Sequence, residues 1–374
     1  MKKVLILYTS VGLGHKSIAE NIAHHLAHRG YAVRHADILR LQEGAWVRFG
    51  TGLHRWLNKH APLILKFLYR YGYVIFSRLR TVVASKNYYE TKELIDEYQP
   101  DVVITTQTSA SAVVAYLKRQ GLYRGKFAIA FSDYHFHPYW IYPEADLYFT
   151  NISEQEREMT KRGIKKERII LSGITLPPRE VLDQALIRSR LGISVDAKVV
   201  LFSSGSLGIS FDPTWLVKEV EKTATNTNTY VLIVCGKNTT LHETLLKTKL
   251  PPSIHIFGFY NSMTELYGIA DIMVGKAGGL TLAETWQMKL PVIVTHYLPG
   301  QEELNYLYAK DKELIIPGIE NNKPLPSEKL QSRITDELST GVFKQSLITN
   351  PNLVFLIQDN LQNSPVGEAI DRLF

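Results

Sequence analysis

The stretch KAGGLTLAETWQMKLPVIVTHYLPGQEELN, residues 276–305, contains groups that could hold a phosphate. Gly278 and Gly279 precede a helical pattern that starts at Leu280. The first amides of a helix have no intrahelical partner, and the helix dipole is positive there. The amides of Leu280 and Thr281 could therefore bind a phosphate.

The same stretch carries polar groups suited to sugar hydroxyls. Glu284 follows the glycine pair by about one helical turn, so its carboxylate could accept hydrogen bonds from a ribose. Gln301 and Glu302 open another helix after the strand PVIVTH and could hold a second sugar. The alternative is a packed glycine turn followed by a capping Gln-Glu pair. Phosphate, ribose and sugar each find a partner, which favours a sugar nucleotide.

A glycine-rich turn near the start of the chain ends in a histidine. In TSVGLGHKS, Gly12 and Gly14 allow a tight turn and close approach by a ligand, and His15 would lie at the mouth of a cleft. Ser17 stands where the dinucleotide fingerprint GxGxxG needs its third glycine. A plain strand–helix turn is the alternative interpretation of this motif.

A third polar cluster lies in FAIAFSDYHFHPYW. Asp133 follows an apolar run, and a carboxylate beside an imidazole can orient it or share in proton transfer. His135 and His137 could form half of a zinc site, but no further ligand pair has matching spacing nearby. A structural role is therefore favoured for these two histidines.

The elements that must position these residues alternate along the chain. Apolar runs and helical patterns follow one another, as in parallel sheets with crossover helices. The expected strands are KVLILY, YAVRHAD, DVVITT, FAIAFSD, DLYFT and RIILSG in the first half, and KVVLFSSG, YVLIVCG, IHIFGF, DIMVGK, PVIVTH and ELIIP in the second. This α/β pattern predicts two doubly wound domains facing a cleft, with ligands at the carboxyl ends of the strands.

The domain boundary is expected at the Pro-Pro pair in ITLPPREVLDQALIRSRLG. We assign residues 1–175 to the first domain, 176–192 to a linker and 193–374 to the second domain. The final residues NSPVGEAIDRLF are expected to form a closing helix of the second domain. Residues 345–362 have no clear assignment.

Composition places limits on the class of protein. The 374 residues include 45% hydrophobic residues and one cysteine, Cys235, so no intrachain disulfide can form. No stretch reaches the ~18 consecutive apolar residues of a membrane span. The apolar run after the two N-terminal lysines is short and ends in a Gly-rich turn, which favours a strand over a signal peptide. We expect a soluble or peripheral protein of a reducing compartment.

Residues 44–89 form a basic aromatic insert. The segment has no Asp or Glu and carries eight Lys or Arg residues, so it accounts for the whole net charge of +7. Nucleic acid, a membrane surface or ordinary packing could explain it. Aliphatic runs such as PLILKFL argue against base stacking and favour an anionic membrane over nucleic acid. The expected membrane contacts are Trp46, Arg55, Trp56, Lys59, Lys66 and Arg70.

The motifs together resemble a known enzyme family. The stretch from Lys276 onward is similar to the donor-binding region of MurG-like glycosyltransferases with the GT-B fold. The matches GLGHKSIAENIAHHL, SDYHFHPYW, DLYFT, VCGKN and GFYNSM occur in the family's order. The greatest similarity is to monogalactosyldiacylglycerol synthases and processive diacylglycerol glucosyltransferases of glycosyltransferase family 28.

The resemblance implies roles for individual residues. His15 matches the loop histidine that acts as base on the acceptor hydroxyl, and Asp133 matches the acidic residue near it. The implied donor contacts are Phe259 and Tyr260 at the uracil, Gly279, Leu280 and Thr281 at the diphosphate, Glu284 at the ribose, and Gln301 and Glu302 at the sugar.

The sequence also departs from the family pattern. SSGSLG replaces the usual glycine run, so Ser204, Gly205 and Ser206 are assigned as phosphate contacts by position. TTQTSAS lacks the His-Pro of many relatives, which puts the usual acceptor geometry in doubt.

The sequence therefore predicts an inverting hexosyltransferase that uses UDP-glucose or UDP-galactose. Its acceptor would be diacylglycerol or a related glycolipid, at the cytoplasmic face of a membrane. No DxD-type carboxylate pair stands where a donor metal would need it, so we expect no metal or other cofactor. No obligate protein partner and no nucleic acid are expected. A different acceptor, a nucleotide-sugar epimerase and a non-catalytic UDP-sugar or lipid-binding protein are the alternatives.

Overall fold

The chain forms two compact units in a computed structural model. The structure describes residues 1–10, 13–41, 61–72, 82, 84–86, 88–178, 181–208, 211–226, 228–354, 356 and 365–374. Unit 1 contains residues 1–178, 299–304 and 358–374, and unit 2 contains residues 179–298 and 305–357. The chain therefore passes between the units more than once.

Unit 1 is built on a six-stranded sheet in the order β2-β1-β3-β4-β5-β6, with every pair parallel. The strands are β1 (Lys3–Tyr8), β2 (Ala32–Asp37), β3 (Val102–Thr105), β4 (Lys126–Ala130), β5 (Leu147–Thr150) and β6 (Ile169–Leu171). Apolar side chains fill successive positions of β1 and β3 and are fully buried, because helices cover both faces of a parallel sheet.

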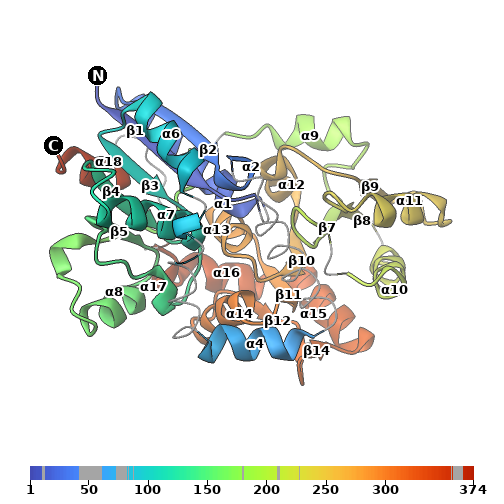
Figure 1. The fold of residues 1–374 in the computed structure, drawn as a ribbon. Helices are drawn as coiled ribbons and strands as arrows, with labels where there is room; N and C mark the ends of the chain where they lie inside the picture. Colours follow the sequence, from blue (N-terminus) through green and yellow to red (C-terminus); the bar gives the residue numbers. More distant parts are fainter. Residues whose placement is uncertain are drawn as a thin grey trace. The chain divides into compact units, whose positions relative to one another are not determined.

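The helices of unit 1 are α1 (Gly14–His28), α2 (Ile38–Leu41), α4 (Pro62–Tyr71), α6 (Tyr89–Tyr98), α7 (Thr108–Arg119), α8 (Ser153–Thr160) and α18 (Pro365–Asp371), with 3₁₀ turns η1 (Pro138–Trp140) and η2 (Lys166–Arg168). Of these, α1, α6 and α7 pack against the sheet (Figure 1). Leu5 and Leu7 share a core with α6 and α7, whereas α1 and α18 pack against each other.

Unit 2 contains a second parallel sheet in the order β12-β11-β10-β7-β8-β9. Its strands are β7 (Lys198–Ser203), β8 (Thr229–Val234), β9 (Ile254–Phe257), β10 (Ile272–Lys276), β11 (Val292–His296) and β12 (Ile316–Pro317). A small antiparallel hairpin, β13 (Ile319–Glu320) and β14 (Lys323–Pro324), follows. The sequence did not indicate this hairpin.

The helices of unit 2 are α9 (Gln184–Arg190), α10 (Pro213–Ala224), α11 (Thr239–Lys247), α12 (Met263–Ile269), α13 (Gly279–Gln287), α15 (Ser327–Thr340), α16 (Val342–Thr349) and α17 (Pro351–Val354). Helix α14 (Gln301–Asp311) begins in the part of the chain that groups with unit 1. Leu216 of α10, Leu241 of α11 and Leu330 of α15 share a core with Phe202 and Ile233 of the sheet.

All twelve predicted strands are present, and one assignment needs correction. The boundary between the units, after Pro178, falls inside the predicted linker 176–192, which also contains helix α9, capped by Asp183 accepting from the Leu186 amide. The predicted closing helix of the second domain is α18, and it belongs to unit 1. Asp371 of this helix is bonded to Arg29 and to the Tyr31 hydroxyl. These bonds attach the C-terminal helix to residues of unit 1.

Candidate functional site

Each sheet has one point where its strand order reverses. In unit 1 this switch lies between β1 and β3, and in unit 2 it lies between β7 and β10. Loops leaving neighbouring strands diverge at such a point and leave a crevice at their carboxyl ends. His15 follows β1, and the glycine turn at Gly278 follows β10, so both predicted motifs stand at switch points.

His15 is fixed against the loop after β3. Its Nδ1 lies 2.7 Å from the Thr106 carbonyl oxygen, and the Thr106 hydroxyl donates to the His15 carbonyl at 2.9 Å. A carbonyl can only accept, so Nδ1 carries the proton and Nε2 of the neutral ring keeps its lone pair. Burial lowers the pKa of His15, while Asp133 and the Thr106 carbonyl partly oppose that shift. The ring is therefore neutral near pH 7 and can accept a proton at Nε2.

Asp133 is 4% exposed, in the loop after β4. Its Oδ2 accepts from the Ser132 hydroxyl at 2.8 Å and from the Gln301 side-chain amide at 2.5 Å. The backbone of the loop is also held, because the Gln155 amide donates to the carbonyls of Asp133 and His135. Asp133 and His15 follow strands β4 and β1 at the carboxyl edge of the same sheet, and the Asp133 carboxylate opposes the effect of burial on the pKa of His15.

Gln301 and Glu302, predicted as sugar contacts, lie in the segment 299–304 of unit 1. The Gln301 amide binds Asp133, and the Glu302 side chain is largely buried. Gln301 thus has a second feature that the sequence did not indicate, a direct bond to the predicted catalytic carboxylate.

The two histidines after Asp133 have structural partners. His137 Nε2 donates to the Tyr69 carbonyl at 2.8 Å, and its Nδ1 accepts from the Tyr139 amide at 3.2 Å. His135 Nε2 is hydrogen-bonded to the Tyr69 hydroxyl at 2.6 Å. Within the described ranges no group of three His, Cys, Asp or Glu residues could hold a metal ion. These hydrogen bonds fit the structural role that the sequence favours for the two histidines.

In unit 2, the loop after β7 and the loop after β10 approach each other around Lys276. Gly205 has φ +77°, and a Cβ there would lie 2.5 Å from Lys276 Cε. A Cβ at Gly278 would lie 3.5 Å from Lys276 Nζ. The two glycines therefore make room for the lysine, whose ammonium group lies near the start of α13.

The start of α13 leaves backbone donors without intrahelical partners. The Leu282 amide makes the first bond, to the Gly278 carbonyl, so Gly279, Leu280 and Thr281 offer their amides. Ser204 is 1% exposed, and its hydroxyl has no hydrogen-bond partner in the structure as described. A buried hydroxyl without a partner is costly, so this group is available to bond a ligand. Lys276, these amides and Ser204 form what we call the anion cradle.

Glu284 lies one turn into α13. The Tyr267 hydroxyl donates to its Oε2 at 3.4 Å. Burial raises the pKa of Glu284 to about 7, and the Tyr267 bond opposes this shift. A ribose that donated hydrogen bonds to the carboxylate would replace part of the lost solvation.

Two family models match this chain. Monogalactosyldiacylglycerol (MGDG) synthase matches residues 15–176, and the glycosyltransferase family 28 C-terminal domain matches residues 199–346. Together these ranges span most of both units. The chain belongs to the family 28 glycosyltransferases.

Relatives of this family 28 chain cover nearly its whole length. It is 27% identical to a processive diacylglycerol beta-glucosyltransferase of Bacillus subtilis (strain 168), over 98% of this chain and 97% of the relative. The solved glycotransferase of kitacinnamycin covers 100% of this chain and 99% of its own, with a TM-score of 0.66 and 12% identity. These likenesses and the two sheets give the fold as GT-B.

The fold by itself does not separate transferases from epimerases. The UDP-GlcNAc 2-epimerase from Neisseria meningitidis, solved with UDP-GlcNAc, has a TM-score of 0.56 and 11% identity. It covers 100% of this chain and 99% of its own. The family models distinguish the two classes, because both describe glycosyltransferases.

The predicted uracil contacts of this family 28 chain differ in their surroundings. Phe259 is 47% exposed after β9, with the Lys237 ammonium 5.7 Å from its ring centroid. Tyr260 instead donates to Glu265 at 2.8 Å and accepts from Arg190 at 3.3 Å. Phe259 therefore has the more open ring face, and Tyr260 belongs to a surface network.

Several predicted contacts lie outside the described residues. These are Gly12 in the glycine loop and Trp46, Arg55, Trp56 and Lys59 in the insert. Lys66 and Arg70 lie on α4, but the structure describes only their backbone. Gly14 is the first residue of α1. In the described part of the chain, no helix is long and apolar enough to span a bilayer.

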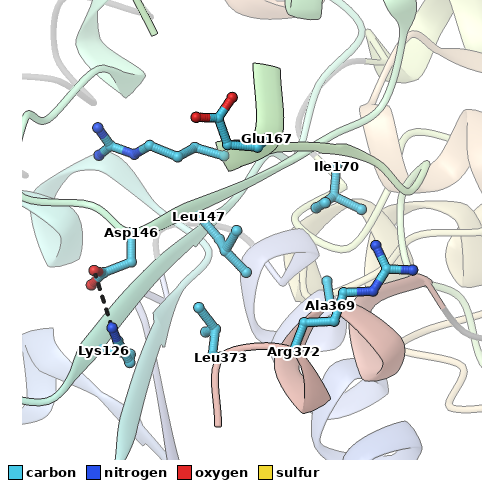
Figure 2. Close-up of a pocket in the computed structure, with 9 residues that line it drawn as sticks. Lys126, Asp146, Leu147, Glu167, Ile170, Ala369, Arg372 and Leu373 are labelled. Atoms are coloured by element: carbon cyan, nitrogen blue, oxygen red, sulfur yellow. Dashed lines mark ion pairs between the residues drawn. The ribbon is translucent and has the colours of Figure 1, made fainter. Parts of the chain in front are cut away.

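A cavity of about 360 Å³ lies elsewhere in unit 1 (Figure 2). Lys126 and Leu147, which line it, begin β4 and β5, so it lies at the amino ends of the strands. Arg372 and Leu373, near the C-terminal end of the sequence, also line it. Asp133 and His15 lie at the opposite, carboxyl edge of the same sheet, and this cavity is therefore no part of the candidate active site.

Proposed function

We propose that this chain transfers a hexose from a UDP-sugar to diacylglycerol or a related glycolipid, with inversion at the anomeric carbon. The proposal is carried by one observation, the anion cradle at the β7–β10 switch point with Glu284 one turn away. A diphosphate and a ribose match this spacing. The lipid acceptor is inferred from the relatives, which are named processive diacylglycerol beta-glucosyltransferases.

In the proposed reaction, His15 Nε2 removes the proton from the acceptor hydroxyl. The oxygen attacks the anomeric carbon, and the bond from that carbon to the diphosphate breaks. Negative charge then grows on the leaving diphosphate, where Lys276, the Ser204 hydroxyl and the α13 amides stabilise it. An α-linked donor gives a β-glycoside. Asp133 stabilises the imidazolium that His15 becomes.

We also propose peripheral binding at the cytoplasmic face of the membrane. Ile64, Phe67 and Tyr71 of α4 are 55%, 62% and 58% exposed. Their spacing of three and four residues places them on one face of the helix. The segment 44–89 around α4 carries eight cations and no acidic residue, which suits anionic lipid head groups.

The test uses labelled UDP-glucose and UDP-galactose with vesicles of diacylglycerol and anionic phospholipid. Label in the organic phase, lost in His15→Ala, supports transfer. Epimerised sugar nucleotide in the aqueous phase would show a different reaction on the same cradle. Binding of the donor without either product would overturn the assignment as a transferase.

A further inference from the structure

Helix α4 has one exposed face and one anchored face. Ile64, Phe67 and Tyr71 form the exposed face, and the rings of Phe67 and Tyr71 are 5.1 Å apart. At 100° per residue, Tyr69 points almost directly away from these three side chains. The anchored face is therefore centred on Tyr69.

Tyr69 is bonded to both histidines that follow Asp133. Its hydroxyl is 2.6 Å from His135 Nε2, and its carbonyl accepts from His137 Nε2 at 2.8 Å. Its ring also contacts the His137 ring, at a centroid distance of 4.4 Å. One residue of α4 thus holds the segment after Asp133 at two successive histidines.

Tyr69 also packs on the segment that carries Gln301. Gly300 has φ +92°, and a Cβ there would lie 3.1 Å from Tyr69 Cγ. The next residue, Gln301, donates from its side-chain amide to Asp133 at 2.5 Å. Tyr69 therefore contacts both the segment that carries Gln301, through Gly300, and the segment after Asp133, through His135.

We propose that Tyr69 is a positioning residue, which holds the Asp133 carboxylate and the Gln301 amide in register and links them to helix α4. The kinetic test of this inference rests on the proposed function, because it measures hexose transfer. Tyr69 itself touches no reacting atom. Its effect passes through His135 and Gly300 to the residues around Asp133.

The consequence for chemistry follows from the field of Asp133 at His15. The positive end of the Gln301 N–H dipole offsets part of the carboxylate's field through its hydrogen bond. When Tyr69 no longer holds this segment, that bond lengthens and the carboxylate acts more strongly on His15. The pKa of His15 then rises, because Asp133 already acts on it in that direction. Less of the neutral base is present at a given pH.

The first experiment compares Tyr69→Phe with Tyr89→Phe. Both remove one phenol hydroxyl, but Tyr89 is 61% exposed at the start of α6. We expect kcat for lipid glycosylation to fall about 3- to 10-fold in Tyr69→Phe, on the scale of one hydrogen bond. The acidic limb of its pH–rate profile should move to higher pH. The Kd for UDP, measured by calorimetry, should stay unchanged.

The second experiment perturbs the contact from the other side. Gly300→Ala places a methyl group against the Tyr69 ring, whereas Gly163→Ala has a similar φ of +84° and nothing within 4 Å. Both put a Cβ at a similar positive φ, so the difference between them reports the contact. We expect the shifted acidic limb in Gly300→Ala and not in Gly163→Ala.

A purely structural role gives a different result. It would lower Tm and the active fraction while the pH limb and the kcat of active protein stay at wild-type values, and that outcome overturns the proposal. If the wild-type protein transfers no hexose, the proposed function fails on its own. The titration of His15 by NMR, assigned with His15→Ala, then decides the role of Tyr69, because it needs no substrate. An unchanged His15 titration in Tyr69→Phe refutes it.

Discussion

Glu284 makes donor binding depend on pH in a way that can be calculated. Burial raises the pKa of Glu284 to about 7 in the ligand-free protein. Ribose hydroxyls that donate to the carboxylate favour its ionised form, so affinity for the donor should rise with pH. The ionised fraction is about one tenth at pH 6 and about nine tenths at pH 8, which gives about a tenfold change in Kd, or ~1.4 kcal/mol.

The assay is calorimetry with UDP-glucose, whose diphosphate has no group that titrates in this range. Glu284→Gln should bind with a Kd independent of pH between 6 and 8. Tyr267→Phe removes the hydrogen bond that lowers the pKa of Glu284, so its midpoint should move to higher pH. A wild-type Kd that does not change with pH, or a slope that persists in Glu284→Gln, would refute the assigned ribose contact.

Four further outcomes are expected. Lys276→Met should weaken UDP binding about 10- to 100-fold, the scale of a charge-assisted bond, measured by calorimetry. Ser204→Ala should weaken UDP binding about 3- to 10-fold while Tm stays equal or rises, because it removes a buried hydroxyl without a partner. Glu284→Gln should stabilise the ligand-free protein by about 1–3 kcal/mol at pH 8 and not at pH 4, measured by denaturant unfolding. The pKa of Glu284 is raised in the folded protein, so the wild type loses stability as pH rises from the unfolded value of 4.5 through about 7. Ile64→Glu with Phe67→Glu should reduce sedimentation with anionic vesicles at least tenfold and leave UDP affinity unchanged.

The sheets could be predicted because their strands are buried on both faces. In a parallel sheet covered by helices, a strand such as β1 or β7 appears in the sequence as a short continuous apolar run. Gly278 and His15 could be placed for the same reason, since each directly follows such a run. The strand order then put both motifs at switch points.

The residues that the sequence did not indicate depend on contacts between distant segments. Lys276 could be assigned a role only when Gly205 and Gly278 were seen to make room for it. Tyr69 lies in the basic aromatic insert, where nothing in the local sequence distinguishes it from Tyr71. The C-terminal helix α18 was assigned to the wrong domain because its partners, Arg29 and Tyr31, are more than 300 residues away in the sequence.

The two switch points differ in charge, and this difference assigns them to different substrates. The crevice of unit 1 contains Asp133 and the His15 imidazole. The carboxylate would repel a diphosphate, and the neutral imidazole has no net charge to attract one. The crevice of unit 2 contains the Lys276 ammonium, the α13 amides and the Ser204 hydroxyl, all of which favour an anion. We therefore expect the anionic donor on unit 2, and the neutral acceptor hydroxyl, which must lose a proton, beside His15. Exchanging the two sites would place a diphosphate against a carboxylate and leave the acceptor without a base.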